Sequence, residues 1–532
     1  MIDIGVAVSQ TVVLLFFVHA IWIFVSLFAV ARWIGRQGSR EEFAAGLHPT
    51  LVVLLPALRE QSLVVETLRF YATVRYPGLL VPIVVTSRKE DHDRQRQLDA
   101  LKEAWEGECP PRSDGDVKRV LAAVLSPSDC AAVLHEVLSI PAHDIAGRSA
   151  AARSALRALP TTAEVAETAI KELNAADGAR TCYHVSYPRI TGRKGSQLNH
   201  AVALLEQLDP DVPVDPDNTL VAVYDFDALP HPRTFVDVGA EAARRRAAQK
   251  PIPAMLQQVQ LPFNFRSSFA KGTDGLLMRG QVLYWLRRGL AIETGRLLVK
   301  RSLDRRRLPR PVRGLVRPMI YGIGSGMFFR LDALRVAGPF PEPHDDLAMG
   351  YRASFLGWDI VPVPSFNLTE PYYTCASMVR AWASVCYGGT RVRDDLHHVG
   401  ERATPLRRWE QWALVCKEWL DTFVWFAGCL LVPVALVVTA TAGPVWSLLV
   451  GAALLLAYPV TALALLGLLP GLREHLGDTS RSWLTNRRIA AALVALFVFQ
   501  PFVSATGPWS LAKSALTSGR RGADLVNGKT ER

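Results

Sequence analysis

Two aspartates on either side of one aromatic residue, Asp225 and Asp227, form the pattern in this chain best suited to chemistry. They follow the apolar run Val221–Tyr224, which predicts a buried strand that ends before Pro230. Residues two apart on a strand share a face, so the two carboxylates are predicted to emerge together. Such oxygens suit Mg²⁺ or Mn²⁺, which can bridge to the phosphates of a ligand such as a nucleotide sugar. The alternative is a solvated turn.

The composition indicates both lipid-facing and soluble parts. Of the 532 residues, 50% are hydrophobic and 20% are charged. The net charge is +11, and many of the arginines lie beside apolar segments, for example Arg32, Arg36, Arg487 and Arg488. This placement favours an anionic membrane face as the partner. Basic and aromatic residues do not interleave as in a nucleic-acid groove, so we expect no nucleic-acid partner.

The seven cysteines are odd in number and contain no Cys-x-x-Cys pair. They therefore indicate neither a zinc site nor a disulfide framework. A reducing, cytosolic side is the expected location of the soluble part.

Residues 1–35 are predicted to form an N-terminal transmembrane anchor. The segment Val6–Val30 carries no charge, and at about 1.5 Å per residue it can cross a hydrocarbon core of roughly 30 Å. The alternative is a cleaved signal peptide, which the length of the segment and the acidic Asp3 disfavour. The arginines that follow place the C-terminal end of the anchor in the cytoplasm.

Residues 417–510 are predicted to form a second membrane region. Apolar segments at 423–442 and 446–469 are separated by Gly443-Pro444, which indicates an extracytoplasmic turn. A third segment, 489–503, is interrupted at Gln500-Pro501 and either crosses or is re-entrant. We place the basic tail, 511–532, in the cytoplasm, which predicts a multi-pass protein of the plasma membrane with a cytoplasmic catalytic domain.

The body between the membrane regions, residues 46–375, has the alternating pattern of an α/β domain. Strands are predicted at 51–55 and 81–86, with a helix at 60–73 between them. Residues from about 91 to 180 are predicted to form a helical insertion of unknown role. Parallel strands bind ligands beyond their carboxyl ends, so the residues after Leu55, Val85 and Tyr224 are predicted to converge on one crevice.

Five segments in order resemble the membrane-embedded glycosyltransferase family 2 enzymes, the class that includes cellulose, chitin and hyaluronan synthases. The resemblance covers about residues 48–375 and implies a GT-A fold, a Rossmann-like nucleotide-diphospho-sugar transferase domain, with transmembrane helices on both sides. The matching segments are Leu55–Glu60, Arg193–His200, Asp225–Asp227, Tyr321–Arg330 and His344–Arg352.

The resemblance assigns a role to individual residues. Pro56 and Glu60 would meet the nucleotide base, and Asp225 would contact the nucleotide sugar. Asp227, with Asp225, would hold the Mg²⁺ or Mn²⁺. Asp346 falls on the position of the catalytic base, and Asp345 replaces the customary glutamate beside it. An inverting transfer needs such a base on the acceptor side.

The segment around Lys194 also contains residue types suited to binding a phosphate. Gly195 and Ser196 can open a helix whose free N–H groups face an anion, while Lys194 supplies a mobile positive charge for a phosphate. Asn199, one turn further on, could hold the strand that carries the aspartates.

Two features depart from the family. The second strand ends in Thr86-Ser87 without the usual acidic residue, which leaves the nucleotide base open. The Gln-x-x-Arg-Trp motif is absent, and its nearest counterparts are Arg380 and Trp382, which we expect to contact substrate. They lie in a segment, 376–416, that is predicted to be amphipathic and interfacial. The last residues, Gly528–Arg532, resemble the tail of bacterial members.

These observations predict an inverting, metal-dependent glycosyltransferase. Its partners would be a nucleotide-diphospho-sugar donor, a glycan or lipid acceptor and the membrane, and the sequence does not decide between single and repeated addition. One alternative is a sugar-phosphate nucleotidyltransferase, although Leu55–Glu60 lacks the glycine-rich phosphate loop expected there. Another is a non-catalytic scaffold or export subunit that binds nucleotide sugar without turnover.

Overall fold

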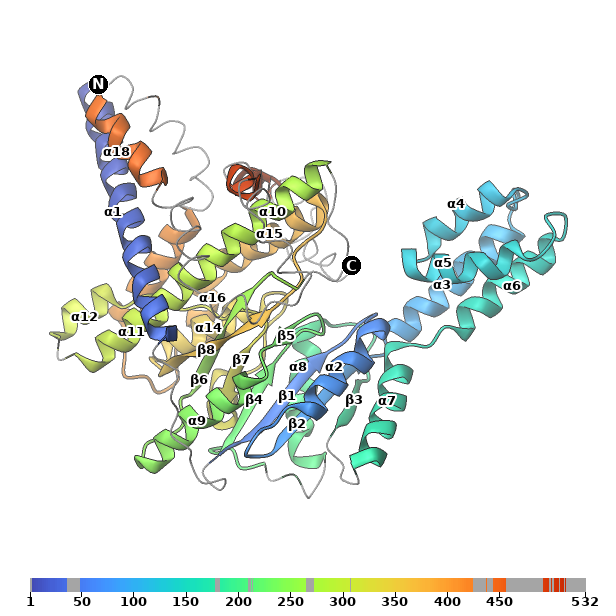
Figure 1. The fold of residues 1–532 in the computed structure, drawn as a ribbon, viewed down its shortest axis with the longest axis horizontal. Coiled ribbons are helices and arrows are strands. Elements are labelled where there is room, and N and C mark those ends of the chain that lie inside the picture. Colours follow the sequence, from blue (N-terminus) through green and yellow to red (C-terminus); the bar gives the residue numbers. More distant parts are fainter. Residues whose placement is uncertain are drawn as a thin grey trace. The chain divides into compact units, whose positions relative to one another are not determined.

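A computed structural model of the protein describes residues 2–35, 48–177, 182–208, 212, 214–264, 272–306, 308–423, 437, 444–455, 491–496, 499, 502–506, 508–510 and 512. Eight strands in these residues form a sheet in the order β3-β2-β1-β4-β7-β6-β8-β5 (Figure 1). The pairs β2–β3 and β6–β8 are parallel, and β4–β7, β6–β7 and β5–β8 are antiparallel. The fold is therefore α/β with a mixed sheet.

The strands are short and mostly buried, as their β-branched and apolar sequences predict. The predictions of strands at 51–55 and 81–86 and of a helix at 60–73 are confirmed to within one residue at each end. The strand bounds are β1 Thr50–Pro56, β2 Leu80–Ser87, β3 Tyr183–Tyr187, β4 Thr219–Val223, β5 Leu229–Pro230, β6 Met255–Leu261, β7 Met327–Arg330 and β8 Ile360–Leu368.

The chain divides into two compact units, which we describe separately. One unit, the insertion unit, comprises Leu54–Val74 and Val81–Leu208. Besides its strands it contains helices α2 Gln61–Thr73, α3 Lys89–Glu106, α4 Asp114–Val124, α5 Pro127–Leu138, α6 Ile145–Ala158, α7 Thr162–Asp177 and α8 Lys194–Leu204.

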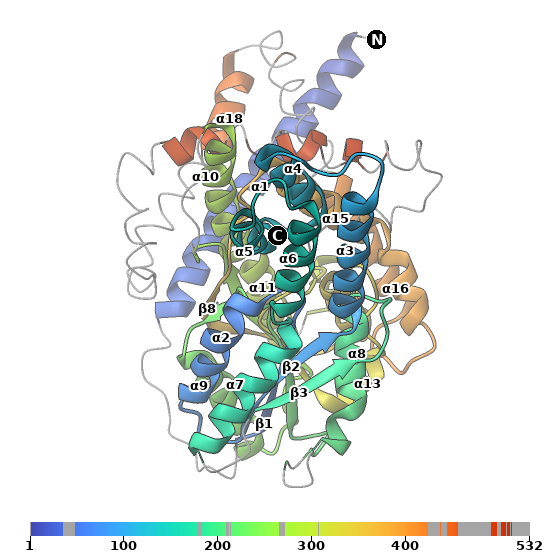
Figure 2. The same cartoon turned by 90° about the vertical axis from the view of Figure 1, so that its right-hand side faces the viewer.

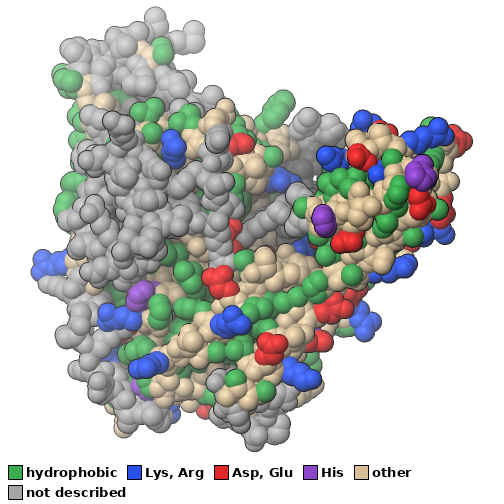
Figure 3. Space-filling model, turned by 45° about the vertical axis from the view of Figure 1, so that its right-hand side comes forward, with side chains coloured by type: hydrophobic (Ala, Val, Ile, Leu, Met, Phe, Trp, Pro, Cys, Tyr) green, Lys and Arg blue, Asp and Glu red, His purple; other side chains and the backbone are tan. Residues whose placement is uncertain are grey.

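Helices α3–α6 lie in the region where the sequence predicts a helical insertion (Figure 2). Local capping explains where they begin: Ser113 Oγ accepts a hydrogen bond from Asp116 N at 3.1 Å, and Ser126 Oγ accepts one from Asp129 N at 3.2 Å. These helices share a small apolar core that includes Leu101 and Leu121. Charged side chains of both signs cover their outer surface (Figure 3).

The other unit, the main unit, comprises Met1–Val53, Arg75–Leu80 and Asp209–Arg532. Its helices in the described residues are α1 Ile2–Gly35, α9 Arg233–Ala247, α10 Gly272–Arg287, the π-helix η3 Arg288–Thr294, α11 Gly295–Arg305, α12 Arg310–Val316, α13 Leu331–Ala337, α14 Asp345–Phe355, α15 Cys375–Thr390, α16 Val392–Val399 and α18 Pro444–Leu455, together with 408–423.

Helix α1 has two different apolar faces. Ile23, Leu27 and Val30 are buried in a core that they share with residues of α10 and η3. On the rest of the helix, large apolar side chains are exposed, namely Leu14, Val18, Ile21, Val25 and Phe28. Their spacing of three and four residues gives a continuous stripe along the helix.

Among the described residues, α1 alone is long and apolar enough to cross a membrane, over the window Phe17–Ile34. A buried core helix or a signal sequence can have the same length and composition as such a membrane-crossing helix. The three segments predicted near the C-terminus fall largely outside the described residues. The described parts of them, which include α18, residues 491–496 and 502–506, are helical.

Candidate functional site

The two aspartates of the Asp-x-Asp pattern lie in a turn directly after β4. All five residues of β4 are buried, and the strand ends at Val223. Ala228 N then donates to Asp225 O at 3.0 Å and closes a turn over Phe226, which is 1% exposed. The prediction that both carboxylates emerge from one strand face is therefore wrong, because β4 ends at Val223 and both aspartates lie in the turn that follows it.

The turn buries the second aspartate more than the first. Asp225 is partly buried, whereas Asp227 is 2% exposed. Asn264 Nδ2 donates to Asp227 O at 2.9 Å and holds the turn from the loop after β6. The hydroxyl of Tyr224 donates to Gln258 Oε1 at 2.6 Å and fixes the base of the turn to β6. Several bonds to neighbouring elements thus set the position of this turn.

The glycine segment Gly322–Gly326 lies beside the turn. Strands β4 and β7 pair antiparallel with Val223 opposite Met327, so the residues that follow β4 face those that precede β7. Asp225 N donates to Ser325 Oγ at 3.4 Å, and Gly326 N donates to Val223 O at 2.9 Å. Gly326 has φ of +86°, a conformation that favours glycine. The glycine segment therefore extends the ladder to the aspartate turn.

The carboxylate of Asp346 lies against the same glycine segment. A Cβ atom added to Gly324 would be 2.8 Å from Asp346 Oδ2, and one added to Gly322 would be 2.4 Å from Asp346 O. Asp346 Oδ1 accepts a hydrogen bond from Leu347 N at 2.8 Å, in the first turn of α14. Asp225 and Asp346, far apart in sequence, thus contact neighbouring residues of one short segment.

Close packing of two glycines holds α14 in this place. A Cβ atom at Gly350 would lie 1.9 Å from Gly322 N, so no other residue fits at that position without a shift of the backbone. Because Gly350 is one turn beyond Asp346 on the same helix, this contact fixes the distance of the carboxylate from the glycine segment. Asp345, beside it, is partly buried at the start of α14.

His344 precedes α14 at the N-cap position, and its side chain is uncharged. It is 8% exposed, and burial lowers its pKa to about 4 although the charge of Asp346 acts in the opposite direction. Its ring meets that of Tyr387 edge to face at 5.7 Å. At neutral pH His344 therefore adds no positive charge beside Asp346.

Buried amide side chains behind the glycine segment were missed in the sequence. Asn367 Nδ2 donates to Ser325 Oγ at 2.9 Å, and Gln257 Oε1 accepts from Ile323 N at 3.2 Å. Gln258 Nε2 donates to Thr234 Oγ1 at 2.6 Å. The signal was available, because Gln257 and Gln258 interrupt the apolar strand β6, where a polar side chain needs a buried partner.

The predicted nucleotide contacts belong to the insertion unit. Gln197 Nε2 donates to Ala57 O at 3.3 Å, which ties helix α8, with Lys194 and Asn199, to the loop after β1 that holds Pro56 and Glu60. Glu60 N donates to Thr162 Oγ1 at 3.0 Å. The buried Glu90 accepts from Arg59 N at 3.4 Å and from Thr162 N at 3.1 Å. The roles of these four residues in nucleotide binding stay predictions.

Trp382 lies in an aromatic cluster of the main unit. It is 3% exposed, stacks on Trp285 with ring centroids 6.0 Å apart, and contacts Tyr284 edge to face. These are the surroundings of a packing residue. Arg380, on the same helix α15, is partly buried. Contact of either residue with substrate stays a prediction.

The oxygens of the aspartate turn are the donors through which the protein would hold a metal. In the described part of the chain, no three His, Cys, Asp or Glu side chains come together as a ligand set. Two carboxylates nonetheless fit Mg²⁺ or Mn²⁺, because such ions commonly take one or two carboxylates and complete their shell with water and substrate phosphates. Asp225 and Asp227 have the chemistry for this arrangement.

A comparison with solved structures matches the chain to a mannosyltransferase from Pyrobaculum calidifontis, solved in complex with GDP-Man and Mn²⁺. The two share 12% sequence identity, with a TM-score of 0.40, over 92% of this chain and 98% of that one. No protein-family model and no curated protein matches the chain. The functional assignment consequently depends on the residues of the site.

Proposed function

We propose that this protein is an inverting, metal-dependent glycosyltransferase of the GT-A type. It would transfer a sugar from a nucleotide-diphospho-sugar to a membrane-associated glycan or lipid at the cytoplasmic face. The observation that carries the proposal is the contact of Asp225 and Asp346 with one glycine segment, through Ser325 and Gly324. Asp225, through its backbone N–H, and Asp346, through its carboxylate, thus meet adjacent residues of one segment, so an acid suited to the donor and an acid suited to the acceptor lie at the same place.

In the proposed reaction, Asp346 accepts the proton of an acceptor hydroxyl. The acceptor oxygen forms a bond to the anomeric carbon, while the bond from that carbon to the diphosphate breaks with its electron pair on the phosphate oxygen. The neutral His344 adds no positive charge that would compete with Asp346 for its role as a base. A base held in place in this way is generally worth about 10²- to 10⁴-fold in rate.

Asp225 and Asp227 would hold the donor through the cation. When bound, Mg²⁺ or Mn²⁺ would supply positive charge that stabilises the departing diphosphate. The turn that carries both aspartates is fastened by Asn264 and Ser325, so the carboxylates are positioned before the donor arrives. The glycines of the segment would admit the sugar close to the backbone.

The exposed apolar stripe of α1 supports attachment to a membrane. Water disfavours a row of five large apolar side chains, whereas lipid accommodates it. We propose that α1 crosses the membrane with its C-terminal end in the cytoplasm, because Arg32 lies near the end of its apolar window and further arginines follow in the sequence. The main unit, which carries Asp225, Asp227 and Asp346 and which we call the catalytic unit from here on, would then lie at the cytoplasmic face.

Detergent-purified protein should be incubated with Mn²⁺, a membrane lipid extract and a panel of donors such as UDP-glucose, UDP-N-acetylglucosamine and GDP-mannose. We expect one donor to give a labelled product. Asp227→Ala and Asp346→Asn should abolish it, and Asp217→Asn, which changes an exposed loop aspartate, should not. Donor binding by calorimetry with no product for any donor would overturn the proposal in favour of a non-catalytic scaffold.

A further inference from the structure

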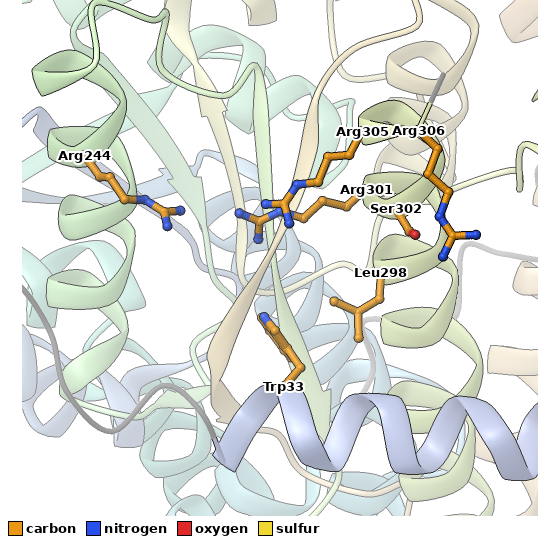
Figure 4. Close-up of a pocket in the computed structure, with 7 residues that line it drawn as sticks. All are labelled: Trp33, Arg244, Leu298, Arg301, Ser302, Arg305 and Arg306. Carbon is orange, nitrogen blue, oxygen red and sulfur yellow. The ribbon is translucent and has the colours of Figure 1, made fainter. Parts of the chain in front are cut away.

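An arginine-lined pocket of about 510 Å³ lies in the catalytic unit, outside the aspartate and glycine residues of the candidate site. It is bounded by Trp33 of α1, Arg244 of α9 and the last turns of α11 (Figure 4). Figure 4 shows the guanidinium groups of Arg301 and Arg305 directed toward the side of Arg244, with the Trp33 ring below them. A second pocket of about 530 Å³ shares these three arginines and adds Arg245 and Lys250.

The carboxylates around the pocket are already engaged by other cations. Glu241 is 3.3 Å from Arg245 and 3.7 Å from Arg301, and it also pairs with Arg244. Asp304 is 2.8 Å from Lys300 and 2.9 Å from Arg317. Asp359 pairs with Arg245. In the described part of the chain, Arg305 and Arg306 make no ion pair, so positive charge is in excess here.

This excess positive charge acts on Arg301. Burial, together with repulsion from Arg305 and Arg244, lowers the pKa of Arg301 to about 10. Its side chain is only 17% exposed, so water screens this repulsion poorly. An anion between the three guanidinium groups would relieve the repulsion, and the planar arginine fork matches the oxygens of a phosphate.

The pocket also has an apolar side. Trp33 and Leu298 line it beside the arginines. Trp33 lies at the C-terminal end of the window Phe17–Ile34, where the apolar face of α1 gives way to Arg32 and the charged surface of the unit. Tryptophan is enriched at that depth of a membrane, at the level of the headgroups. A ligand with a phosphate and an adjoining hydrocarbon part would fill both sides.

We propose that this pocket binds the phosphate headgroup of an anionic membrane lipid. The proposal relies on the proposed crossing of α1, which would bring the pocket to the cytoplasmic leaflet. The lipid would fix the catalytic unit at the surface of the bilayer. None of the residues that line this pocket belongs to the aspartate turn or the glycine segment, to which donor and acceptor chemistry is assigned.

Native mass spectrometry of the full chain in detergent can test the site without any transfer reaction. We expect phosphatidylglycerol to be retained at least tenfold better than phosphatidylcholine, and inorganic phosphate at millimolar concentration not to displace it. Equal retention of both lipids would overturn the proposal. Displacement by inorganic phosphate would overturn it as well, in favour of a soluble-phosphate site. These measurements use the unaltered protein and remain decisive if a variant fails to fold.

Substitution of the lining arginines tests whether the lipid binds in this pocket. Arg301→Gln and Arg305→Gln should each weaken retention of phosphatidylglycerol roughly fivefold, as expected for one arginine at a charged membrane surface. Arg157→Gln, which changes an exposed arginine of α6, is the matched control and should have no effect. Unchanged retention in the Arg301→Gln, Arg305→Gln double variant would refute this location. Because the readout is lipid retention, an inactive transferase would not affect the result.

Discussion

Replacement of Gly324 by alanine should displace the Asp346 carboxylate while leaving the stability of the fold nearly unchanged. The new Cβ would lie 2.8 Å from Asp346 Oδ2, so the oxygen must move by about 0.6 Å to reach the 3.4 Å of an ordinary contact. The atom in the way is the end of a side chain, which can rotate. Gly324 does not have a positive φ, so alanine is compatible with its backbone.

The expected effect is large for catalysis and small for folding. A misplacement of about 1 Å commonly costs about 100-fold in rate, so a shift of about 0.6 Å should lower kcat roughly 10- to 100-fold. The free energy of unfolding should change by less than about 1 kcal/mol, because alanine also restricts the unfolded chain. Donor KM should stay nearly constant, since Asp346 is assigned to the acceptor.

Gly322→Ala is the matched comparison in the same segment. Its Cβ would lie 2.4 Å from the backbone oxygen of Asp346 and 2.6 Å from Met327 Sδ, so backbone must move and stability should fall. Initial rates with the donor found in the panel and thermal unfolding in detergent measure the two effects. A Gly324→Ala variant that is as active as wild type would refute Asp346 as the base. A variant as unstable as Gly322→Ala would refute the claim that only the carboxylate moves.

Three further predictions concern the site and its support. Ser325→Ala should lower the free energy of unfolding by about 1–3 kcal/mol, measured by thermal melting, because Asn367 Nδ2 loses its acceptor in a buried place. Asp227→Asn should raise the Mn²⁺ concentration for half-maximal rate at least tenfold, since one anionic ligand becomes neutral. Burial raises the pKa of the Asp395 carboxyl from 3.8 to about 6 despite its ion pair with Arg352, which corresponds to roughly 3 kcal/mol. The folded state therefore favours the protonated acid. The contribution of Asp395 to the free energy of unfolding is fully present below pH 4 and is lost as the pH rises through 6. Relative to wild type, Asp395→Asn should accordingly gain up to about 3 kcal/mol between pH 4 and 7 in urea unfolding.

Each of these predictions has a clear contrary outcome. Ser139→Ala, at an exposed helix end, is the control for Ser325→Ala, and equal melting temperatures of the two variants would contradict the buried hydrogen bond. An unchanged Mn²⁺ requirement in Asp227→Asn would remove this residue from the metal site. A difference between Asp395→Asn and wild type that stays constant from pH 4 to 7 would show that the carboxyl titrates alike in the folded and unfolded chain.

Local sequence was sufficient for the elements that their own residues specify. The buried runs of β1, β2 and β4 are almost entirely apolar and rich in valine, a pattern that predicts buried strands. The helix starts in the insertion unit follow from Ser113, Ser126 and the residues three positions later, which bond within one turn. Helix α1 is recognisable from sequence because a long apolar segment without charge can adopt few structures other than a helix.

The sequence by itself determined which acids are candidates for chemistry, but only the tertiary structure decided how they meet. The turn that holds Asp225 and Asp227 is fixed in place by hydrogen bonds to Asn264 and Ser325, which are distant in the chain. Asp346 lies beside the same glycines because Gly350 allows α14 to pack against Gly322, a fit that depends on the absence of two Cβ atoms. Motif spacing encodes local geometry, whereas such contacts depend on shape and hydrogen bonding between elements that the folded chain brings together.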